Sequence, residues 1–467
     1  MGGEHQNSVS AFFDRLGRSF ERIMFKAIPV WLFVLTFLVW IVGTVGFGWV
    51  VKHKMESQRT FGVVGDAAFF VASFPSLVRE ALSDVSSSMP LVSGDPFPGQ
   101  AGFDVRGGFI DKGYLLMSSH DADVGATSVK LIRLSDRKQI YRWIVNLDEI
   151  RKHGPFKSGW EPHDNRFRAI HPLMVADGGV MFHDEQGPLV KLNACSTVEW
   201  IYDAPTHHEI DIGPAGNIWT ASAVQKVNFP EDVYPGMKDD AITEISPSGK
   251  RMMERSVAGI LMRNGYRGLL FGVREYEADI IHLNSIEVAR TDSAYWKAGD
   301  ILVSVRNIST VFLYRPGTDK VIWLKTGPWL NQHDARFLNN ESISIFGNDV
   351  MRRSSVHESP VILGGHNEVY VYNFRTDTVS APYHKILSEL KPVTITEGRA
   401  KILPDGDLFF EETDFGRMFR VSDGDIRWTY VDRQDKNDPI GVANWSRYLS
   451  ADAVEPSLSK LHCAKRS

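Results

Sequence analysis

The stretch Gly299-Asp300-Ile301-Leu302-Val303-Ser304-Val305, followed by the hairpin Val311–Trp323, contains the unit that decides the fold. It begins with a turn and one strand, and it continues with two strands around a polar turn. Similar units recur along the chain. Their turns are Lys112-Gly113, Gly178-Gly179, Gly216-Asn217, Gly299-Asp300, Asn340-Glu341 and Gly406-Asp407, and their hairpins are Val129–Trp143, Leu189–Trp200, Ala241–Arg251, Val311–Trp323, Val369–Ser380 and Met418–Trp428.

These six units predict an all-β fold, a six-bladed β-propeller over residues 106–450. Their spacing averages roughly the 40–50 residues of a propeller blade. Circular stacking would cover the strand edges that a single blade leaves open. A β-sandwich is the alternative, but it does not require a Trp at the recurring positions 143, 200, 323 and 428. Little helical periodicity is present here, and Tyr383–Leu390 is one candidate for a short helix.

Composition and charge exclude some classes of function. The 467 residues have a formal net charge of −5, whereas a surface that binds nucleic acid needs an excess of Lys and Arg. We therefore expect no nucleic-acid partner. The two cysteines, Cys195 and Cys463, are too few for a thiolate zinc site, and the sequence leaves open whether they pair.

The segment 27–51 has no charged residue and carries Trp31 and Trp49 near its ends. About 20 apolar residues suffice to cross a bilayer as a helix, and Trp favours the headgroup level. A cleaved signal peptide is the nearer alternative, but its apolar region is usually shorter, about 7–15 residues. We expect one transmembrane helix in the bacterial inner membrane, with residues 1–26 in the cytoplasm because more basic residues precede the span than follow it.

The chain after this span is expected to face the periplasm. Residues 52–105 would form a stalk, with an amphipathic helix over about 57–82 and a linker rich in Ser, Pro and Gly over 83–102. Residues 451–467 would be a C-terminal tail.

The repeats also show which polar residues occupy equivalent positions in successive units. His171, His208, His333 and Arg399 precede the turns of four units at a similar offset, and His282 precedes a fifth with a longer gap. Equivalent positions in successive blades are related by rotation about the central axis. We therefore expect one axial pocket, which contains His207 or His208, His282, Arg306 and His333.

Such a cluster suits group transfer. Imidazole can take up a group covalently as a nucleophile. An Arg fork binds an oxyanion, and a second His can move a proton. Imidazoles also bind zinc, copper or iron, but Arg306 would repel a cation, so we expect neither a metal nor another cofactor in the cluster.

Several strings in this region resemble, in the same order, the core motifs of the bacterial arylsulfotransferases. They are His207-His208-Glu209-Ile210-Asp211, His282-Leu283-Asn284-Ser285-Ile286, Ser304-Val305-Arg306-Asn307 and Gln332-His333-Asp334-Ala335-Arg336. The resemblance implies a six-bladed propeller that moves a sulfuryl group from an aryl sulfate ester to a phenolic acceptor, through a sulfohistidine and without a nucleotide donor.

The resemblance further implies a role for each residue. His333 would be the nucleophile, and His282 and Arg306 would hold the sulfuryl oxygens. A member of the His207–His208 pair would be the acid or base, and the repeat offset favours His208. The expected substrate-binding residues are His207, Asn284, Asn307, Arg336, His171 and Arg399.

Two features depart from the family, and other functions stay open. The family's best-known members lose a signal peptide, and the hairpin after His333 ends in Phe346-Gly347-Asn348-Asp349 instead of the usual acidic turn. A non-catalytic propeller that binds glycans or scaffolds an envelope assembly is the main alternative. A quinone-cofactor propeller is a third, since Asp319–Trp323 is similar to such blades.

Overall fold

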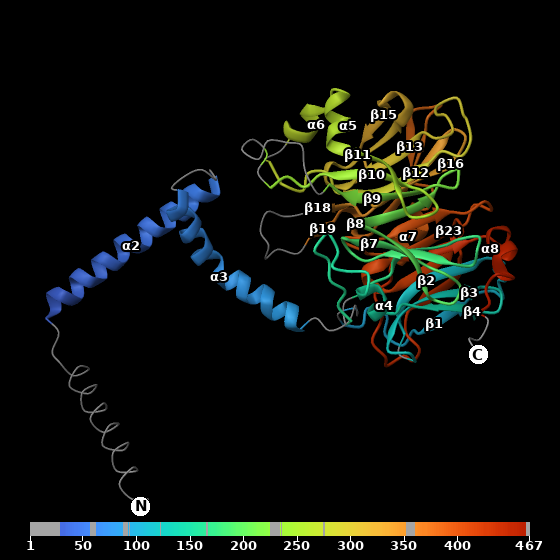
Figure 1. The fold of residues 1–467 in the computed structure, drawn as a ribbon, viewed down its shortest axis with the longest axis horizontal. Coiled ribbons are helices and arrows are strands. Elements are labelled where there is room, and N and C mark those ends of the chain that lie inside the picture. Colours follow the sequence, from blue (N-terminus) through green and yellow to red (C-terminus); the bar gives the residue numbers. More distant parts are fainter. Residues whose placement is uncertain are drawn as a thin grey trace, which may run out of the picture. The chain divides into compact units, whose positions relative to one another are not determined.

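The computed structural model describes residues 29–56, 62–86, 92, 94–121, 123–164, 167–224, 234, 236–273, 276–351 and 360–463 (Figure 1). The expected cytoplasmic segment 1–26 lies outside them. The chain divides into two compact units, Met1–Ser87 and Ser88–Ser467, and each is described by itself.

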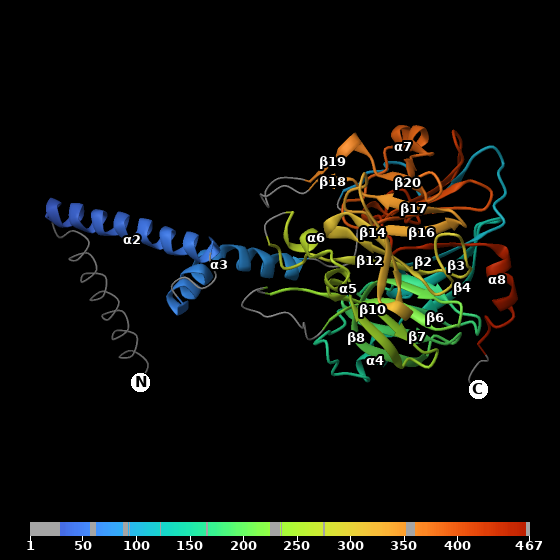
Figure 2. The same cartoon turned by 90° about the horizontal axis from the view of Figure 1, so that it is seen from above.

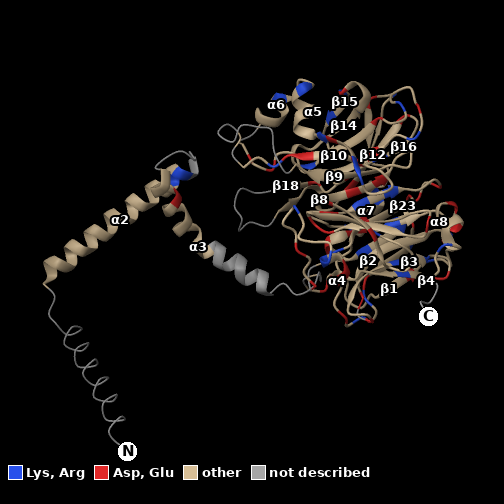
Figure 3. Cartoon of the chain, in the orientation of Figure 1, with Lys and Arg blue, Asp and Glu red and all other residues tan. Residues whose placement is uncertain are grey.

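The first unit consists of two helices, α2 (Val30–Glu56) and α3 (Gly62–Ser86). Figure 3 shows α2 without charge along most of its length, and Lys52 and Lys54 stand in its last turns. At 1.5 Å per residue the helix is about 40 Å long, enough to cross a bilayer. By length and composition α2 fits a membrane anchor or a signal sequence. The helix expected over 57–82 corresponds to α3.

The second unit is an all-β, propeller-like arrangement of antiparallel sheets (Figure 2). Four sheets have four or five strands. In spatial order, the first sheet consists of β26 (Arg447–Leu449), β2 (Tyr114–Asp121), β3 (Ala126–Arg133) and β4 (Lys138–Ile144), and the second of β12 (Leu283–Val288), β13 (Ile301–Val305), β14 (Thr310–Arg315) and β15 (Lys320–Thr326). The third sheet consists of β16 (Asp334–Asn339), β17 (Ser342–Gly347), β20 (Glu368–Asn373) and β21 (Thr378–Ser380). The fourth consists of β22 (Arg399–Ile402), β23 (Leu408–Glu412), β24 (Arg417–Val421), β25 (Ile426–Val431) and β1 (Gly102–Val105).

A seven-stranded sheet and a two-stranded ribbon complete the strands that the structure describes. The larger sheet runs through β5 (Ile170–Met174), β6 (Val180–His183), β7 (Gly187–Leu192), β8 (Val198–Ile212), β9 (Ile218–Ala223), β10 (Asp240–Ile245) and β11 (Arg251–Ser256), and the ribbon pairs β18 (Val350–Met351) with β19 (Val361–Ile362). Strand pairing does not divide the larger sheet into blades. The count of six blades therefore stays a prediction.

Short helices fill the connections between the strands. The helix expected over Tyr383–Leu390 is present as α7 (His384–Leu390), and the long gap before His282 contains α5 (Val257–Arg263) and α6 (Arg267–Phe271). The other helices are α4 (Leu147–Arg151), α8 (Ala451–Leu458) and the 3₁₀ turns η1 (Arg306–Ile308), η2 (Pro316–Thr318), η3 (Leu363–Gly365) and η4 (Thr413–Phe415).

Each predicted turn leads into a strand, since β2, β6, β9, β13, β17 and β23 follow the six turns. Of these, β2, β6, β13, β17 and β23 are second from an end of their sheet, and β9 lies inside the seven-stranded sheet. The recurring Trp residues lie at positions 143, 200, 323 and 428, on β4, β8, β15 and β25. The innermost strands contact one another in sequence, β5 with β8, β8 with β12, β12 with β16, and β16 with β22. β26 contacts β5, and Lys401 on β22 donates to the Tyr448 carbonyl on β26, so the innermost strands form a ring.

The two ends of the second unit are built into sheets. β26 pairs with β2 through Tyr448 and Leu115, and β1, at the end of the range expected as stalk, pairs with β25. α8 lies in the expected tail, and its Val454 belongs to the same buried hydrophobic cluster as Leu192. Beyond it, Cys463 forms a disulfide with Cys195, a pairing that the sequence left open. Both ends of the second unit are therefore tied to strands distant in sequence.

Candidate active site

Left-handed backbone occurs at or near the beginning of three innermost strands and inside a fourth, β8. The φ angle is +51° at His171, +57° at His208, +49° at His282 and +59° at Trp445. Such angles are uncommon for residues other than Gly, cost roughly 1–3 kcal/mol, and cluster at functional sites. The pairing register shifts beside His171 and His208, so the backbone bends out of regular strand geometry there.

Four imidazoles and one indole gather at these strand ends. The ring of His208 lies 5.0 Å from that of His207, 5.2 Å from His282, 5.4 Å from Trp445 and 6.1 Å from His333, measured between ring centroids. His333 is fully buried, whereas His208 and His282 are partly exposed. The structure thus brings together three histidines that are widely separated in sequence.

Asn348 fixes the tautomer of His333. The Asn348 Nδ2 group donates to the carbonyls of Thr394, at 3.0 Å, and Glu397, at 2.6 Å. Its Oδ1 must therefore face His333 and accept the hydrogen of Nδ1. The lone pair is then on Nε2, a buried atom with no hydrogen-bond partner in the described part of the chain. A neutral imidazole in this state is a nucleophile with an unoccupied reactive atom.

Burial and neighbouring charge keep this imidazole neutral. Burial lowers the pKa of His333 well below its usual 6.5, and the Arg306 guanidinium lowers it further. Burial also lowers the pKa of His208 well below 6.5, with further contributions from His207, His282 and His333. Both rings are therefore in the form that attacks or accepts a proton at pH 7.

Arg306 supplies positive charge beside His333. It begins η1 after β13 and is 1% exposed. Its backbone N–H donates to the His282 carbonyl at 3.0 Å, and its Nη1 donates to Asn307 Oδ1 at 3.1 Å. Asn307 in turn donates to the Asp279 carbonyl at 2.6 Å, so the segment before β12 holds this guanidinium.

Two carboxylates orient the other imidazoles. Asp279 Oδ2 lies 2.8 Å from His282 Nδ1, and Asp240 Oδ1 lies 3.2 Å from His207 Nε2. His207 Nδ1 lies 2.9 Å from His208 Nδ1. The three residues Asp240, His207 and His208 form a chain along which a proton can be shared, and His208 is the member whose ring faces His282 and His333.

The remaining predicted residues lie in the network that supports this cluster. Arg399 donates to His171 Nε2, and His171 Nδ1 donates to the His208 carbonyl at 2.9 Å. Arg336 pairs with Glu209 and, at 2.6 Å, with Asp334. Asn284 is buried and donates to the Gln332 carbonyl at 2.9 Å. These contacts join the four residues to neighbouring strands. Arg399 and His171 thereby support the backbone of His208.

Sequence reasoning missed four contributors, Asn348, Trp445, Asp240 and Asp279. Asn348 stands in the turn that was noted as a departure from the family. Trp445 lies two residues before β26, and His171 lies at the beginning of β5, so the two residues have similar places in their sheets. The three-residue strand β26, however, has no sequence pattern by which it could be predicted. The two carboxylates have no signal in the repeats, because Asp240 begins β10 and Asp279 lies in the loop before β12.

The protein is thus of the all-β, propeller-like class, with a cluster of histidines on its innermost strands. The profile of the arylsulfotransferase (ASST) family matches residues 171–433, more than half of the chain. The chain belongs to this family, and the resemblance seen in the sequence is confirmed. No curated protein matches the chain.

Solved structures give weaker likenesses, with TM-scores under 0.5. A protein of unknown function from Bacteroides caccae has a TM-score of 0.44 and 12% identity, and the match covers 73% of this chain and 99% of that one. Hydrazine synthase from Kuenenia stuttgartiensis has 0.36 and 10%, covering 71% and 80%. A catalytically inactive virginiamycin B lyase from Staphylococcus aureus, with quinupristin, has 0.33 and 11%, covering 56% and 70%.

Proposed function

We propose that this protein is an aryl-sulfate sulfotransferase that works by a ping-pong mechanism through a sulfohistidine at His333, without a nucleotide donor. The observation that carries the proposal is the state of His333. Its ring is neutral and buried, its Nδ1 hydrogen is held by Asn348, and its Nε2 has an available lone pair beside Arg306.

In the first half-reaction, Nε2 of His333 attacks the sulfur of the aryl sulfate ester. The new N–S bond forms as the S–O bond to the aryl group breaks, and that electron pair leaves on the aryl oxygen as a phenoxide. Arg306 and His282 hold the sulfuryl oxygens, His282 through the Nε2–H of its doubly protonated ring, whose Nδ1 hydrogen Asp279 accepts. Preorganised donors of this kind best stabilise the charge on those oxygens. A phenoxide with an electron-withdrawing group needs no proton to depart.

In the second half-reaction, His208 removes the proton of the phenolic acceptor. The acceptor oxygen then attacks sulfur, the N–S bond breaks, and its electron pair returns to Nε2 of His333. Asp240 and His207 stabilise the charge that His208 acquires, as a carboxylate does behind a catalytic histidine. This assignment makes His208 the base and His207 a positioning residue.

The supporting residues keep the base in place. His171 holds the carbonyl of His208, Arg399 holds His171, and Asn307 holds Arg306. Arg336 and Asn284 stabilise the strands that carry these groups, with Asn284 directly against Gln332, the neighbour of His333. Their contribution to substrate binding would be through this framework.

We further propose that the propeller has six blades. The long strand β8 pairs with β7 mainly through residues 198–202 and with β9 through residues 206–212. One strand that serves as the outer edge of one blade and the inner strand of the next would divide the seven-stranded sheet in two. His171, His208, His282, His333, Arg399 and Trp445 would then stand at or near the inner strand ends of six blades.

The proposal includes a membrane location. We infer that α2 is retained as a single inner-membrane anchor, with the N-terminus in the cytoplasm and the propeller in the periplasm. The support is the length of α2 and the absence of charged residues along it before Lys52. An anchored enzyme can use donors and acceptors close to the membrane.

The test is sulfuryl transfer by the purified full chain. It is incubated with 4-nitrophenyl sulfate and phenol, and both nitrophenol release and phenyl sulfate are measured. We expect turnover that the His333→Ala variant lowers by roughly 10³-fold or more, because the nucleophile is lost. The matched control, His153→Ala, changes an exposed histidine and should retain full activity. Full transfer by His333→Ala would refute the mechanism, and binding of aryl compounds without turnover would favour a non-catalytic propeller.

A further inference from the structure

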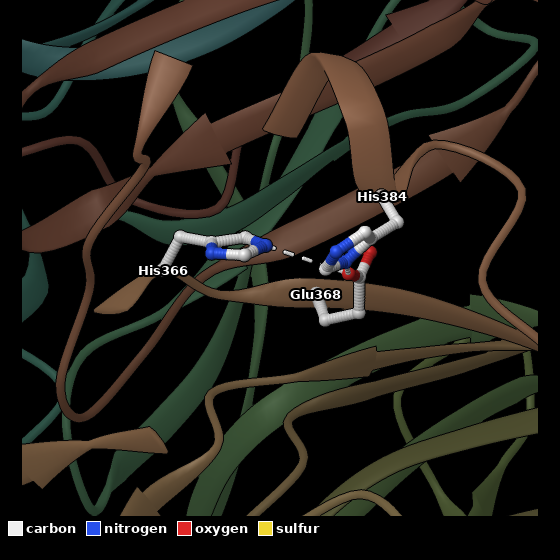
Figure 4. Close-up of side chains that lie close together, drawn as sticks. All are labelled: His366, Glu368 and His384. Carbon is white, nitrogen blue, oxygen red and sulfur yellow. Dashed lines mark hydrogen bonds and ion pairs between the residues drawn. The ribbon is translucent and has the colours of Figure 1, made fainter. Parts of the chain in front are cut away.

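A second histidine cluster lies on β20 and α7, apart from the residues assigned above. His366 lies two residues before β20, Glu368 begins β20, and His384 begins α7 (Figure 4). One possible metal-ligand atom from each residue lies within 4.8 Å of the other two. Among the described residues, these three are the group of His, Cys, Asp or Glu side chains that lie close enough together to hold a metal ion. The three side chains converge on one point in Figure 4.

The hydrogen bonding of His366 decides which nitrogen of its neutral ring carries the lone pair. Nδ1 lies 3.1 Å from the Gly364 carbonyl, which can only accept, so Nδ1 donates. In the neutral ring the lone pair is then on Nε2. That atom is buried without a hydrogen-bond partner, and it faces the carboxylate of Glu368 at 3.5 Å. Two electron-rich atoms that face each other in a buried site favour a cation between them.

Glu368 and His384 complete a ligand set. Glu368 Oε2 lies 2.7 Å from His384 Nδ1 and 3.5 Å from His366 Nε2. Ligands about 2.0–2.1 Å from a tetrahedral zinc ion are separated by roughly 3.3 Å. The 3.5 Å pair is close to this separation, whereas His384 Nδ1, now hydrogen-bonded to Glu368 at 2.7 Å, would move outward as the ion replaces its hydrogen. A backbone carbonyl that fixes the tautomer of a metal-binding histidine, as Gly364 does here, is the usual supporting contact.

Burial differs among the three residues in a way that suits an open site. His366 is 6% and Glu368 5% exposed, whereas the side chain of His384 is 65% exposed. Two ligands are therefore fixed in the protein and the third stands at the surface, where water can fill the remaining position. Two histidines and one carboxylate are a common ligand set for zinc and related divalent ions.

We propose that His366, Glu368 and His384 bind one first-row divalent cation of the zinc class. The ion would fasten α7 to the beginning of β20. Between the two buried ligands stands Asn367, which donates to the Asn348 carbonyl at 2.8 Å and accepts from the Thr394 N–H at 2.6 Å. The ion would thereby also steady the segment whose Asn348 side chain holds His333.

The test uses the purified full chain, stripped of metal with a chelator and titrated with Zn²⁺ by calorimetry. We expect one saturable equivalent, little heat with Mg²⁺, and at least tenfold weaker binding by His384→Ala. The exposed position of His384 lets this variant fold, which circular dichroism checks. Glu368→Gln should also weaken binding, and His153→Ala should not.

Two results would overturn the proposal. One is the absence of a saturable equivalent, and the other is equal Zn²⁺ affinity in the wild type and His384→Ala. Neither result depends on sulfuryl transfer, so a failure here leaves the proposed activity to its own test.

Discussion

At the scale of the residue, one amide decides the chemistry of His333. Asn348 donates both Nδ2 hydrogens to backbone carbonyls, so its Oδ1 accepts the hydrogen bond from Nδ1 of His333. The sequence placed His333 at an axial position from the repeat offset alone. It could not reveal Asn348, because the contact depends on how a turn folds back on the strand before it.

We predict that Asn348→Ala lowers kcat by about 10–100-fold with little change in KM. The physical reason is that Nδ1 and Nε2 then compete for the proton, so the attacking lone pair is present in a fraction of the molecules and the ring is less well oriented. Steady-state kinetics with 4-nitrophenyl sulfate measure the effect. Asn437→Ala, at an exposed position, is the control. Unchanged kcat in Asn348→Ala would remove the tautomer argument.

The pH dependence follows from the lowered pKa values. Burial lowers the pKa of His333 and of His208 well below 6.5, so both neutral rings persist as the pH falls from 8 to 6.5. Activity should be lost only as the pH falls through the lowered values, at pH below 6.5. Profiles of kcat/KM between pH 5 and 8 measure this, with thermal unfolding at each pH to separate inactivation from loss of structure. An acid limb centred at or above 6.5 would contradict the assignment.

At the scale of the element, the inner strands were partly predictable. The six turns with Gly, Asp or Asn are local signals, and each led to the strand that was expected. The helix α7 was also found, because its apolar spacing is local. β26 and β1 have three and four residues and pair with strands far away in sequence, so nothing local distinguishes them from loop. That is why Trp445, which depends on β26, was missed.

The C-terminal segment should contribute measurably to stability. The Cys195–Cys463 disulfide spans 268 residues, and removing a crosslink typically costs about 2–5 kcal/mol because the unfolded chain gains freedom. We predict that the Cys195→Ser and Cys463→Ser double variant melts several degrees lower than the wild type while its circular dichroism spectrum stays the same. Calorimetry measures the shift. Equal melting temperatures would show that β26 and α8 hold the end of the chain without the disulfide.

At the scale of the whole molecule, the family and the all-β, propeller-like arrangement followed from the sequence. The number of blades and the membrane location depend on more than local pattern. The seven-stranded sheet runs without a break through β8, and a long apolar helix fits an anchor or a signal sequence. Experiment therefore decides the number of blades and the fate of α2.

A retained anchor predicts an intact chain in the membrane. After expression in a bacterium, the protein should stay in the membrane fraction through an alkaline carbonate wash, and its mass should match the full 52.5 kDa. Trp40→Arg, near the middle of α2, should reduce insertion, since Arg at a helix centre costs about 2.5–3.5 kcal/mol. A soluble product that lacks the residues of α2 would show that the helix is a cleaved signal.

The central claim is that His333 carries the sulfuryl group covalently. The most direct measurement is mass spectrometry of the full chain and its peptides after brief exposure to 4-nitrophenyl sulfate without an acceptor, followed by addition of phenol. The account predicts one added sulfuryl group on His333, discharged by phenol and absent from His333→Ala. A sulfuryl group on another residue, or rapid turnover with an unmodified His333 under these conditions, would contradict it.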